Sequence, residues 1–458
     1  MPESFDAIVV GAGQAGPALA VRCGRHGWKT ALVERLRLGG TCVNNGCIPT
    51  KTMIASARAA HMARRAADFG VLVDGPVRVD MARVQARKDQ VVERSRDGLR
   101  RWLGDAPGLT LIDGHARFVA PHRLRVGERE LEAPHIFLNV GTRPSTPDLP
   151  GIGEVPFLDN EGMMHLDTLP EHLVVVGGSY VGLEFAQMMR RFGAAVTVVE
   201  MGPRLIARED EEVSEAIREM LAAEGIAFRL NATCIALQRR GDRVAVGVSC
   251  REGEPQVEGS HILLAIGRVP NTHDLGLEAA GIRTDPRGYI AVDDQLRTSI
   301  EGVYALGDCN GRGAFTHTSW NDHEIVVANL FDGDKRKLSD RITSYALFTD
   351  PPLGRIGLTL AQMRASGRRL LVAKMPMSRV GRAVEMGETT GFMSIGVDAE
   401  SLEILGAAIL GVHGDEVVQA LLELMAARAP YTTLQHAVHI HPTVAELLPT
   451  LLERLAPA

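Results

Sequence analysis

Two cysteines, Cys42 and Cys47, stand five positions apart within residues 39–51 and could support redox chemistry. On a straight helix, side chains at this spacing point about 140° apart and their Cα atoms lie roughly 8–9 Å apart. A disulfide needs Cα atoms within about 4.4–6.8 Å, so this pair can close only where the backbone is distorted. Gly46 and Pro49 are predicted to supply the distortion, one by its freedom in φ and the other by its missing backbone donor. Strained, exposed disulfides are the labile ones, so the pair is predicted to be redox-active.

Other roles for the pair are weaker. A zinc site needs about four ligands at short spacing, whereas the remaining cysteines are scattered singly along the chain. A structural disulfide that closes so small a loop would restrain little chain entropy. We therefore expect redox catalysis and no metal site, with a structural pair as the alternative.

The length and charge of the chain limit its class. A chain of 458 residues is expected to contain about three domains. Its net charge of −6 gives no electrostatic footprint for nucleic acid. A predicted strand over residues 5–10 begins the chain without a basic leader, and no apolar run reaches the ~18 residues that span a bilayer. We expect a soluble, cytoplasmic protein with no nucleic-acid or membrane partner. In a reducing compartment a cysteine pair more often has a redox or catalytic role than a structural one.

A strand, a glycine turn, a helix, and a second strand that ends in an acid occur in this order twice. The first copy carries Gly11, Gly13, Gly16 and Glu34; the second carries Gly177, Ser179, Gly182 and Glu200. In both copies the acid follows the first glycine by 23 positions (34 minus 11, and 200 minus 177). The glycines allow a tight turn and close approach to a pyrophosphate, the helix N-terminus binds its charge, and the acid binds a ribose. Each copy is therefore predicted to bind a dinucleotide, the alternative being an ordinary unit without ligand.

Residues 39–51 closely resemble the redox-active segment of the class I pyridine nucleotide-disulfide oxidoreductases, the family of glutathione reductase, lipoamide dehydrogenase and mercuric reductase. Three other kinds of segment fit this resemblance: two domain crossings, a second flavin fingerprint, and the first strand of the C-terminal domain. They are residues 136–144 and 262–270, residues 302–308, and residues 344–352. The first crossing reads Asn139-Val140-Gly141 where the family usually has Ala-Thr-Gly. The resemblance covers essentially the whole chain.

The resemblance implies an α/β fold with two Rossmann-like dinucleotide-binding domains, for FAD and NAD(P), and a C-terminal α+β dimerisation domain. We expect the FAD-binding domain at residues 1–148 and 269–340. The NAD(P)-binding domain is expected at residues 149–268, and the dimerisation domain at residues 341–458.

The resemblance also implies a set of cofactor-binding residues. For FAD they are Gly11, Gly13, Gly16, Glu34, Gly40, Thr41, Lys51, Gly141, Gly307 and Asp308. For NAD(P) they are Gly177, Ser179, Tyr180, Gly182, Glu200 and Gly267. In the family, the residue matching Asp308 meets the ribityl chain, and the one matching Tyr180 covers the flavin until nicotinamide displaces it. As alternatives, Asp308 could cap a turn and Tyr180 could simply pack at a helix start.

Glu200 bears on the choice of nucleotide. A carboxylate at this position accepts hydrogen bonds from a free 2′-hydroxyl and repels a 2′-phosphate. We therefore expect NADH to be favoured over NADPH, although Arg204 and Arg208 lie close enough in sequence to bind a phosphate.

His441 and Glu446 lie in a His-Pro-Thr-x-x-Glu segment that resembles the family's acid–base element. There the His protonates a leaving thiolate, the Glu orients its ring, and both reach the disulfide of the other subunit. The resemblance thus implies a homodimer with shared active sites. His439 and His441 could instead face one way on a strand and bind a metal, without a third ligand in view. His439 has no assigned role.

Lys51 and Glu184 match an ion pair that in related reductases lies beside flavin N5; a surface salt bridge is the alternative. The implied route runs from nicotinamide through flavin to a Cys42–Cys47 disulfide. Cys47, nearer the flavin, stays a thiolate, whereas Cys42 attacks the substrate and His441 manages the proton.

The predicted activity is that of an NAD(P)H-dependent flavoprotein disulfide reductase whose acceptor is a disulfide or a metal ion. The C-terminal segment that ends at Ala458 contains no cysteine. Its sequence therefore argues against a thioredoxin-reductase-like redox extension and against the C-terminal vicinal cysteine pair of mercuric reductase. Residues 315–326 look more like the reactive-chlorine-resistance branch of mercuric-reductase-like flavoproteins. Two alternatives stay open: a non-catalytic flavoprotein, and a soft-metal-binding protein whose dithiol supplies only two ligands.

Overall fold

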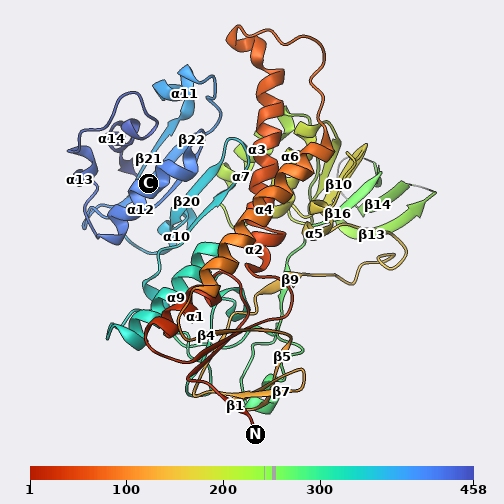
Figure 1. The fold of residues 1–458 in the computed structure, drawn as a ribbon. Helices are drawn as coiled ribbons and strands as arrows, with labels where there is room; N and C mark the ends of the chain where they lie inside the picture. Colours follow the sequence, from red (N-terminus) through yellow and green to blue (C-terminus); the bar gives the residue numbers. More distant parts are fainter. Residues whose placement is uncertain (242, 250–253) are drawn as a thin grey trace.

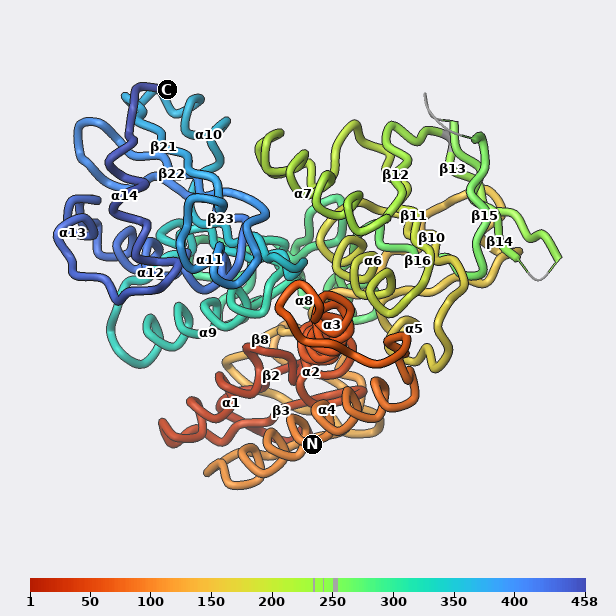
Figure 2. The backbone as a smooth tube through the Cα atoms, turned by 90° about the horizontal axis from the view of Figure 1, so that it is seen from above, coloured from red at the N-terminus to blue at the C-terminus, as the bar shows by residue number. Residues whose placement is uncertain are grey.

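The computed structural model describes residues 1–241, 243–249 and 254–458, which form three lobes around helix α3 (Cys47–Arg64). Figure 2 views α3 nearly end-on where the lobes meet. This helix packs against α4 (Met81–Gly104) of the first lobe and α6 (Tyr180–Phe192) of the second. From α3, Arg58 also pairs with Asp350 and Glu388 of the third lobe. The cysteine-bearing helix is thus held by all three lobes.

The first lobe contains a parallel five-stranded sheet in the order β18-β8-β2-β3-β4. Its strands are β2 (Ala7–Val10), β3 (Thr30–Glu34), β4 (Leu109–Asp113), β8 (His135–Leu138) and β18 (Val303–Ala305). Beside it, α1 (Ala15–Arg25) packs against α9 (Thr316–Phe331) (Figure 1). A smaller sheet has the order β1-β7-β6-β5, from β1 (Glu3–Ser4), β5 (Ala116–Ala120), β6 (Arg123–Val126) and β7 (Arg129–Glu132). Strand β2 is wholly buried because helices or loops cover both faces of a parallel sheet, which explains its unbroken apolar sequence.

The second lobe repeats the parallel arrangement in a four-stranded sheet of order β12-β11-β10-β16. The strands are β10 (His172–Val176), β11 (Ala195–Val199), β12 (Ala227–Arg229) and β16 (His261–Leu264), with α5 (Asn160–Met164) and α7 (Glu211–Ala223) nearby. An antiparallel sheet joins β13 (Thr233–Arg240), β14 (Arg243–Ser249) and β15 (Gln256–Gly259). The chain enters and leaves this lobe through β9 (Thr142–Pro144) and β17 (Arg268–Pro270), which pair antiparallel. The two predicted crossings therefore lie side by side.

The third lobe is an antiparallel six-stranded sheet of order β19-β20-β23-β22-β21-β24 with helices packed on it. Its strands are β19 (Ser344–Leu347), β20 (Leu353–Gly357), β21 (Leu370–Pro376), β22 (Phe392–Asp398), β23 (Ile404–Leu410) and β24 (Ala456–Pro457). The helices are α10 (Leu360–Ala365), α11 (Gly381–Glu385), α12 (Gly414–Ala426), α13 (Thr432–Gln435) and α14 (Leu448–Leu452). Val417, Val418 and Leu421 of α12 are buried and join the core of this lobe.

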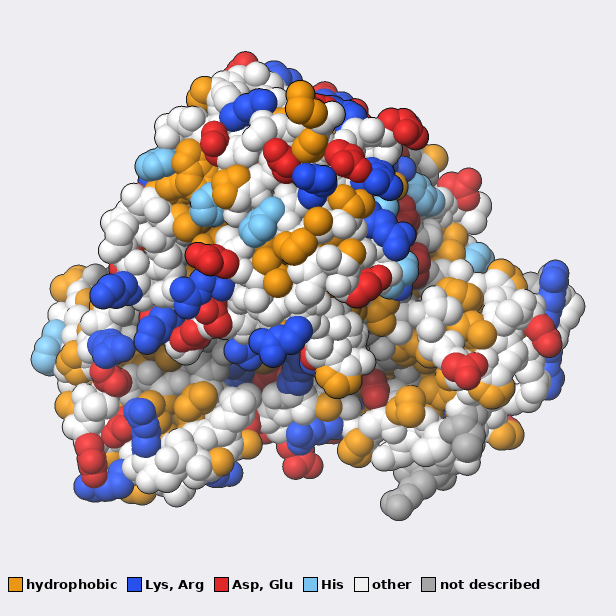
Figure 3. Space-filling model, turned by 90° about the horizontal axis from the view of Figure 1, so that it is seen from below, with side chains coloured by type: hydrophobic (Ala, Val, Ile, Leu, Met, Phe, Trp, Pro, Cys, Tyr) orange, Lys and Arg blue, Asp and Glu red, His pale blue; other side chains and the backbone are white. Residues whose placement is uncertain are grey.

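The predicted fold class is confirmed: two dinucleotide-binding α/β units are followed by a C-terminal α+β unit. The domain limits at residues 148, 268 and 340 stay predictions. Within the described residues, no helix is both long and apolar enough to cross a membrane. On the face shown in Figure 3, Lys and Arg side chains are interspersed with Asp and Glu side chains, in keeping with the small net charge.

Candidate active site

The two predicted dinucleotide turns have the same local geometry. The Glu34 carboxylate accepts the backbone N–H groups of Ala12 at 2.7 Å and Leu36 at 2.8 Å. Glu200 likewise accepts from Gly178 at 2.7 Å and Gly202 at 2.8 Å. Each acid is therefore fixed beside its glycine turn.

Among the described residues, neither α1 nor α6 has a side-chain cap at its N-terminus. The first backbone N–H groups of both helices are thus free to bind phosphate, and the donor sets fit a dinucleotide.

The glycines of these turns are needed for close approach. A Cβ on Gly16 would lie 2.0 Å from the carbonyl oxygen of Gly11, and one on Gly182 would lie 2.1 Å from that of Gly177. Gly11 and Gly177 also have φ of 101° and 115°, which disfavours other residues. By contrast, Ser179 at the middle position is exposed, so this departure costs the turn little.

Asn139 explains the departure from Ala-Thr-Gly. Its buried side chain accepts the N–H of Gly16 at 3.0 Å and donates to the carbonyl of Leu306 at 3.0 Å. It thereby ties the first glycine turn to the segment that carries Gly307. Sequence reasoning assigned no role to Asn139, although the departure itself was visible.

Asp308 is half-buried next to the crossing strands. The hydroxyl of Thr142 donates to its carboxylate at 2.9 Å, and Arg268 donates to the same hydroxyl at 2.8 Å. Burial raises the pKa of Asp308 above its usual value. Gly141 and Gly267, which flank these strands, have φ of 65° and 118°, so both bends suit glycine. The Asp308 carboxyl is thus suited to accept hydrogen bonds from a chain that carries hydroxyl groups.

The cysteine segment is two helices rather than one bent helix. Cys42 lies in α2 (Gly40–Asn44), and Cys47 begins α3. Gly46 breaks the backbone between them with φ −130° and ψ −117°, and a Cβ there would lie 2.9 Å from the carbonyl oxygen of Thr41. Pro49 falls in the first turn of α3, where no backbone donor is needed. The expectation that Pro49 distorts this segment is therefore wrong; the break depends on Gly46.

Gly40 brings the same segment onto the first dinucleotide turn. It has φ of 57°, and a Cβ on it would lie 2.9 Å from the Cα of Gly13. Thr41, next to it, is exposed. The cysteines are therefore adjacent to the site expected to hold FAD.

Cys42 and Cys47 are thiols within hydrogen-bonding reach of one another. The hydrogen bond from Cys42, helped by the Thr316 hydroxyl and the Lys51 charge, lowers the pKa of Cys47 to about 6. The Cys47 sulfur is 3.3 Å from Thr316 Oγ1. The same hydrogen bond and burial raise the pKa of Cys42. Of the two, Cys47 is therefore the thiolate near neutral pH.

Helix α5 of the second lobe holds the loop between the cysteines. Asn160 donates to the carbonyl of Asn45 at 2.8 Å, and the Asn45 amide donates to Glu161 at 3.2 Å. Sequence reasoning missed these contacts, because no local pattern links residues so far apart.

Lys51 and Glu184 form the predicted ion pair, with 2.5 Å between Nζ and Oε2. Glu184 is buried, and its other oxygen accepts the N–H of Phe348 at 3.0 Å. Lys51 also lies 4.6 Å from the centroid of the Phe348 ring. The pair therefore lies between lobes, one turn along α3 from Cys47, and is not a surface salt bridge.

His441 and Glu446 are paired as predicted, with 3.0 Å between His441 Nδ1 and Glu446 Oε2. The His441 side chain is 80% exposed, whereas Glu446 is 16% exposed. Val438 and Ile440 beside it are also exposed. His439 contacts the carbonyl of Ala437 at 3.1 Å. In the described part of the chain, no group of three or more His, Cys, Asp or Glu side chains is placed to hold a metal ion.

Comparison with known proteins defines the class. The pyridine nucleotide-disulphide oxidoreductase family matches residues 5–322, and its dimerisation domain matches residues 343–452. The chain belongs to this family of FAD-dependent, pyridine-nucleotide-linked oxidoreductases, as its sequence predicted. The dimerisation domain indicates a homodimer.

Several relatives align over nearly their whole length. A probable pyridine nucleotide-disulfide oxidoreductase RclA of Escherichia coli is 35% identical over 97% of this chain and 98% of its own. Dihydrolipoyl dehydrogenase of Chlamydia muridarum is 31% identical over 98% of this chain and 96% of its own. The solved structure of the HOCl-induced flavoprotein disulfide reductase RclA from E. coli superposes with a TM-score of 0.89 at 34% identity, covering 98% of this chain and 99% of that one.

Proposed function

We propose that the protein passes electrons from NADH, through bound FAD and the Cys42–Cys47 pair, to a disulfide or a soft metal ion. The proposal rests chiefly on the opposite pKa shifts of the two thiols, which give a thiolate at Cys47 and a proton-bearing thiol at Cys42. Such a division suits a dithiol that opens and closes repeatedly.

The residues that would hold the cofactors are those of the two glycine turns. Gly11, Gly13, Gly16 and Glu34 would hold FAD together with Gly40, Thr41, Lys51, Gly141, Gly307 and Asp308. Gly177, Ser179, Tyr180, Gly182, Glu200 and Gly267 would hold the nicotinamide nucleotide. When bound, FAD supplies the two-electron link between nicotinamide and the cysteine pair. Lys51 places a positive charge, fixed by Glu184, beside that pair.

Turnover of a disulfide acceptor requires two exchanges. His441 first takes the proton of the Cys42 thiol, with Glu446 orienting the ring at Nδ1. The resulting Cys42 thiolate attacks one acceptor sulfur, so a mixed disulfide forms and one thiolate leaves, and His441 returns the proton to that thiolate. Cys47 then attacks Cys42, which closes the Cys42–Cys47 disulfide and releases the second thiolate.

His441 would act on the cysteines of the partner subunit. Its ring is mostly exposed and its described partner is Glu446, which suits a residue that completes its contacts in a dimer. Shared active sites follow from this assignment.

NADH is the proposed donor, because both oxygens of Glu200 are fixed by backbone N–H groups beside the second glycine turn. A carboxylate held there favours a free ribose diol over a 2′-phosphate.

A metal ion is the second candidate acceptor, because a Cu(II) complex of the E. coli relative RclA has been solved. Two Cu(II) ions would each take one electron from the dithiol, leaving two Cu(I) ions, one disulfide and two protons. Thiolates suit the soft product ion.

The test is anaerobic NADH consumption by the flavin-loaded protein with lipoamide, glutathione disulfide or Cu(II) as acceptor. We expect turnover with at least one acceptor, abolished in Cys42→Ser and retained in Cys23→Ala, which removes a buried thiol of α1. NADH oxidation that survives Cys42→Ser would exclude the cysteine route. Binding of copper without NADH consumption would favour a soft-metal-binding protein.

A further inference from the structure

Tyr180 stands at the start of α6, four residues before Glu184. Residues at this spacing share a helix face, so the Tyr180 ring points to the same side as the Lys51–Glu184 pair. Its ring meets Phe315 edge-on, with 6.0 Å between centroids and an interplanar angle of 89°. Phe315 precedes Thr316, whose hydroxyl contacts Cys47. Tyr180 is therefore next to the redox centre.

Tyr345, from β19 of the third lobe, is the second aromatic neighbour of Tyr180. The ring centroids are 5.5 Å apart and the rings are nearly perpendicular, at 83°. The Tyr345 hydroxyl donates to Glu209 Oε1 at 2.5 Å. The Tyr345 ring is therefore fixed through its hydroxyl by Glu209, while its ring packs edge-on against Tyr180. Burial and the Glu209 charge raise the pKa of Tyr345, so it stays a donor.

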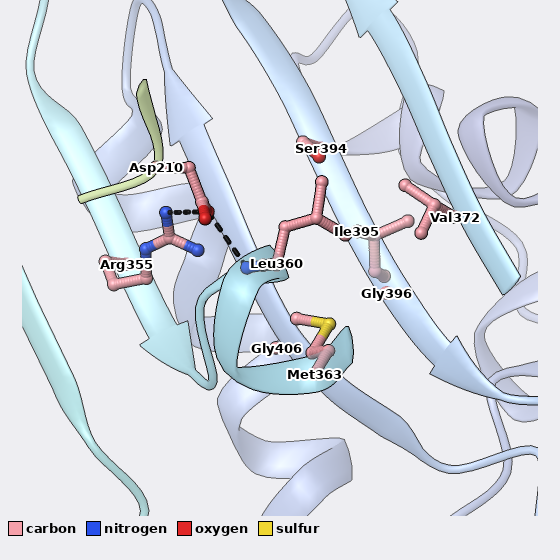
Figure 4. Close-up of a pocket in the computed structure, with 10 residues that line it drawn as sticks. Asp210, Arg355, Leu360, Met363, Val372, Ser394, Ile395, Gly396 and Gly406 are labelled. Carbon is pink, nitrogen blue, oxygen red and sulfur yellow. Dashed lines mark hydrogen bonds and ion pairs between the residues drawn. The ribbon is translucent and has the colours of Figure 1, made fainter. Parts of the chain in front are cut away.

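The acceptor of Tyr345 is itself fixed. Glu209 is buried and accepts from Arg355 Nε at 3.0 Å, and Arg355 also pairs with Asp210 at 3.1 Å. Figure 4 shows Asp210 bonded to Arg355 on one side and to the backbone of Leu360 on the other. Tyr345 therefore has little freedom to follow Tyr180 if that ring moves.

The loop that carries Glu209 is joined to the second glycine turn. The N–H of Ile206 donates to the carbonyl of Gly178 at 2.9 Å, and the N–H of Glu209 donates to the carbonyl of Ile206 at 2.8 Å. The group formed by Tyr345, Glu209 and Arg355 thus connects the third lobe with the turn where the nicotinamide nucleotide is expected.

We propose that Tyr345 is a positioning residue that latches Tyr180 in its covering position, so that an entering nicotinamide must break this contact to displace the ring. The inference rests on the proposed function, in which Tyr180 covers the flavin. When a ligand binds only a sparsely populated conformer, its apparent affinity is reduced by the fraction of molecules in that conformer. The edge-on contact between Tyr345 and Tyr180 therefore weakens nucleotide binding and shields the site between turnovers.

The experiment measures the Kd of NAD⁺ for the oxidised, flavin-loaded dimer by titration calorimetry, and steady-state kinetics with NADH. Tyr345→Phe keeps the ring and removes the hydroxyl that Glu209 fixes, so the ring holds Tyr180 less firmly. We expect the Kd of NAD⁺ and the KM for NADH to fall by about two- to tenfold, with kcat retained. Tyr431→Phe, a tyrosine elsewhere in the third lobe, is the matched control and should leave both constants unchanged.

A double-mutant cycle tests whether Tyr345 acts through Tyr180. Tyr180→Leu removes the latched ring, so Tyr345→Phe should lower the Kd in the wild-type background and leave it unchanged in the Tyr180→Leu background. If Tyr345→Phe does not fold, Tyr180→Leu alone should lower the Kd, because it removes the same ring contact from the other end and leaves Glu209 and Arg355 intact.

An unchanged or raised Kd in Tyr345→Phe overturns the latch, and so does an equal change in Kd in the wild-type and Tyr180→Leu backgrounds. A wild-type flavin that NADH does not reduce overturns the proposed function instead. The two failures are therefore distinct.

Discussion

Lys51 Nζ lies 2.5 Å from Glu184 Oε2, and this ion pair joins the cysteine helix α3 to helix α6 of the second lobe. The two charges act on Cys47 in opposite directions: Lys51 lowers the pKa of that thiol, whereas Glu184 raises it. The pair thus balances the charge next to the thiolate, because Glu184 offsets part of the effect of Lys51.

The balance predicts how the Cys47 thiolate titrates. In the dithiol form, thiolate ultraviolet absorbance should be lost as the pH falls through about 6. Lys51→Met should move that midpoint to higher pH, and Glu184→Gln should move it to lower pH while keeping an acceptor for Phe348. Midpoints that do not move, in variants that still bind flavin, would contradict this electrostatic reading.

Stability of the dithiol form should depend on pH in the same region. The pKa of Cys47 is lowered in the folded protein, from 9.0 to about 6, so the folded state binds the proton less tightly than the unfolded chain. Its contribution to stability is complete above pH ~9 and is lost as the pH falls towards 6. Chemical denaturation of the dithiol form at several pH values measures this, and Cys47→Ser should flatten the dependence.

The proposed contact between Cys47 and the flavin predicts a spectroscopic difference between the two cysteines. Anaerobic NADH should give the wild type a long-wavelength absorbance band from a thiolate beside the flavin. Cys42→Ser leaves Cys47 as a thiolate, so it should show the band without reductant. Cys47→Ser should lack the band. A wild type without it under any reductant would exclude Cys47 as the flavin-side thiol.

The proposed sharing of active sites between subunits predicts complementation between inactive subunits. Cys42→Ser chains mixed with His441→Ala chains should form hybrid dimers with one intact site, restoring about a quarter of wild-type activity after random exchange. Mass spectrometry of tagged chains verifies the exchange. If hybrids form and activity stays absent, His441 does not serve the partner's cysteines.

Glu200 predicts the nucleotide preference. Wild type should have a higher kcat/KM with NADH than with NADPH. Glu200→Arg should shift that ratio towards NADPH by about ten- to a hundredfold, because a repulsive charge becomes a charged hydrogen-bond donor. The matched control, Glu200→Gln, removes only the charge and should give a smaller shift. A wild-type preference for NADPH would show that Arg204 or Arg208 decides the choice.

Asn139 predicts a stability effect at the first glycine turn. Asn139→Ala restores the residue that the family usually has, yet here it leaves Gly16 and Leu306 without their buried partner. We expect a loss of about 1–3 kcal/mol in unfolding free energy, seen by chemical denaturation. Asn329→Ala, at an exposed side-chain contact with the Arg336 backbone, should change stability far less. Equal losses in both variants would contradict the bridging role.

Local spacing was enough to predict the two dinucleotide units. The first glycine, the tight turn and the acid 23 positions later lie within one strand–helix–strand unit, so chain connectivity alone brings them together. The same holds for Cys42 with Cys47 and for His441 with Glu446, which are joined by a few residues of backbone. The prediction that Pro49 contributes to the backbone break was wrong, because a proline in the first turn of a helix gives up no hydrogen bond that the helix needs.

Only the tertiary structure decided the contacts between distant segments. Asn139 reaches Gly16 across 123 positions, and Tyr345 reaches Glu209 across 136. No local pattern records such pairs, because they depend on how three lobes pack around α3. The sequence by itself therefore determined the family, the two glycine turns and the residues that are predicted to carry the chemistry. Packing decided which side chains hold them in place, since a buried polar group takes its partner from whatever segment the fold brings beside it.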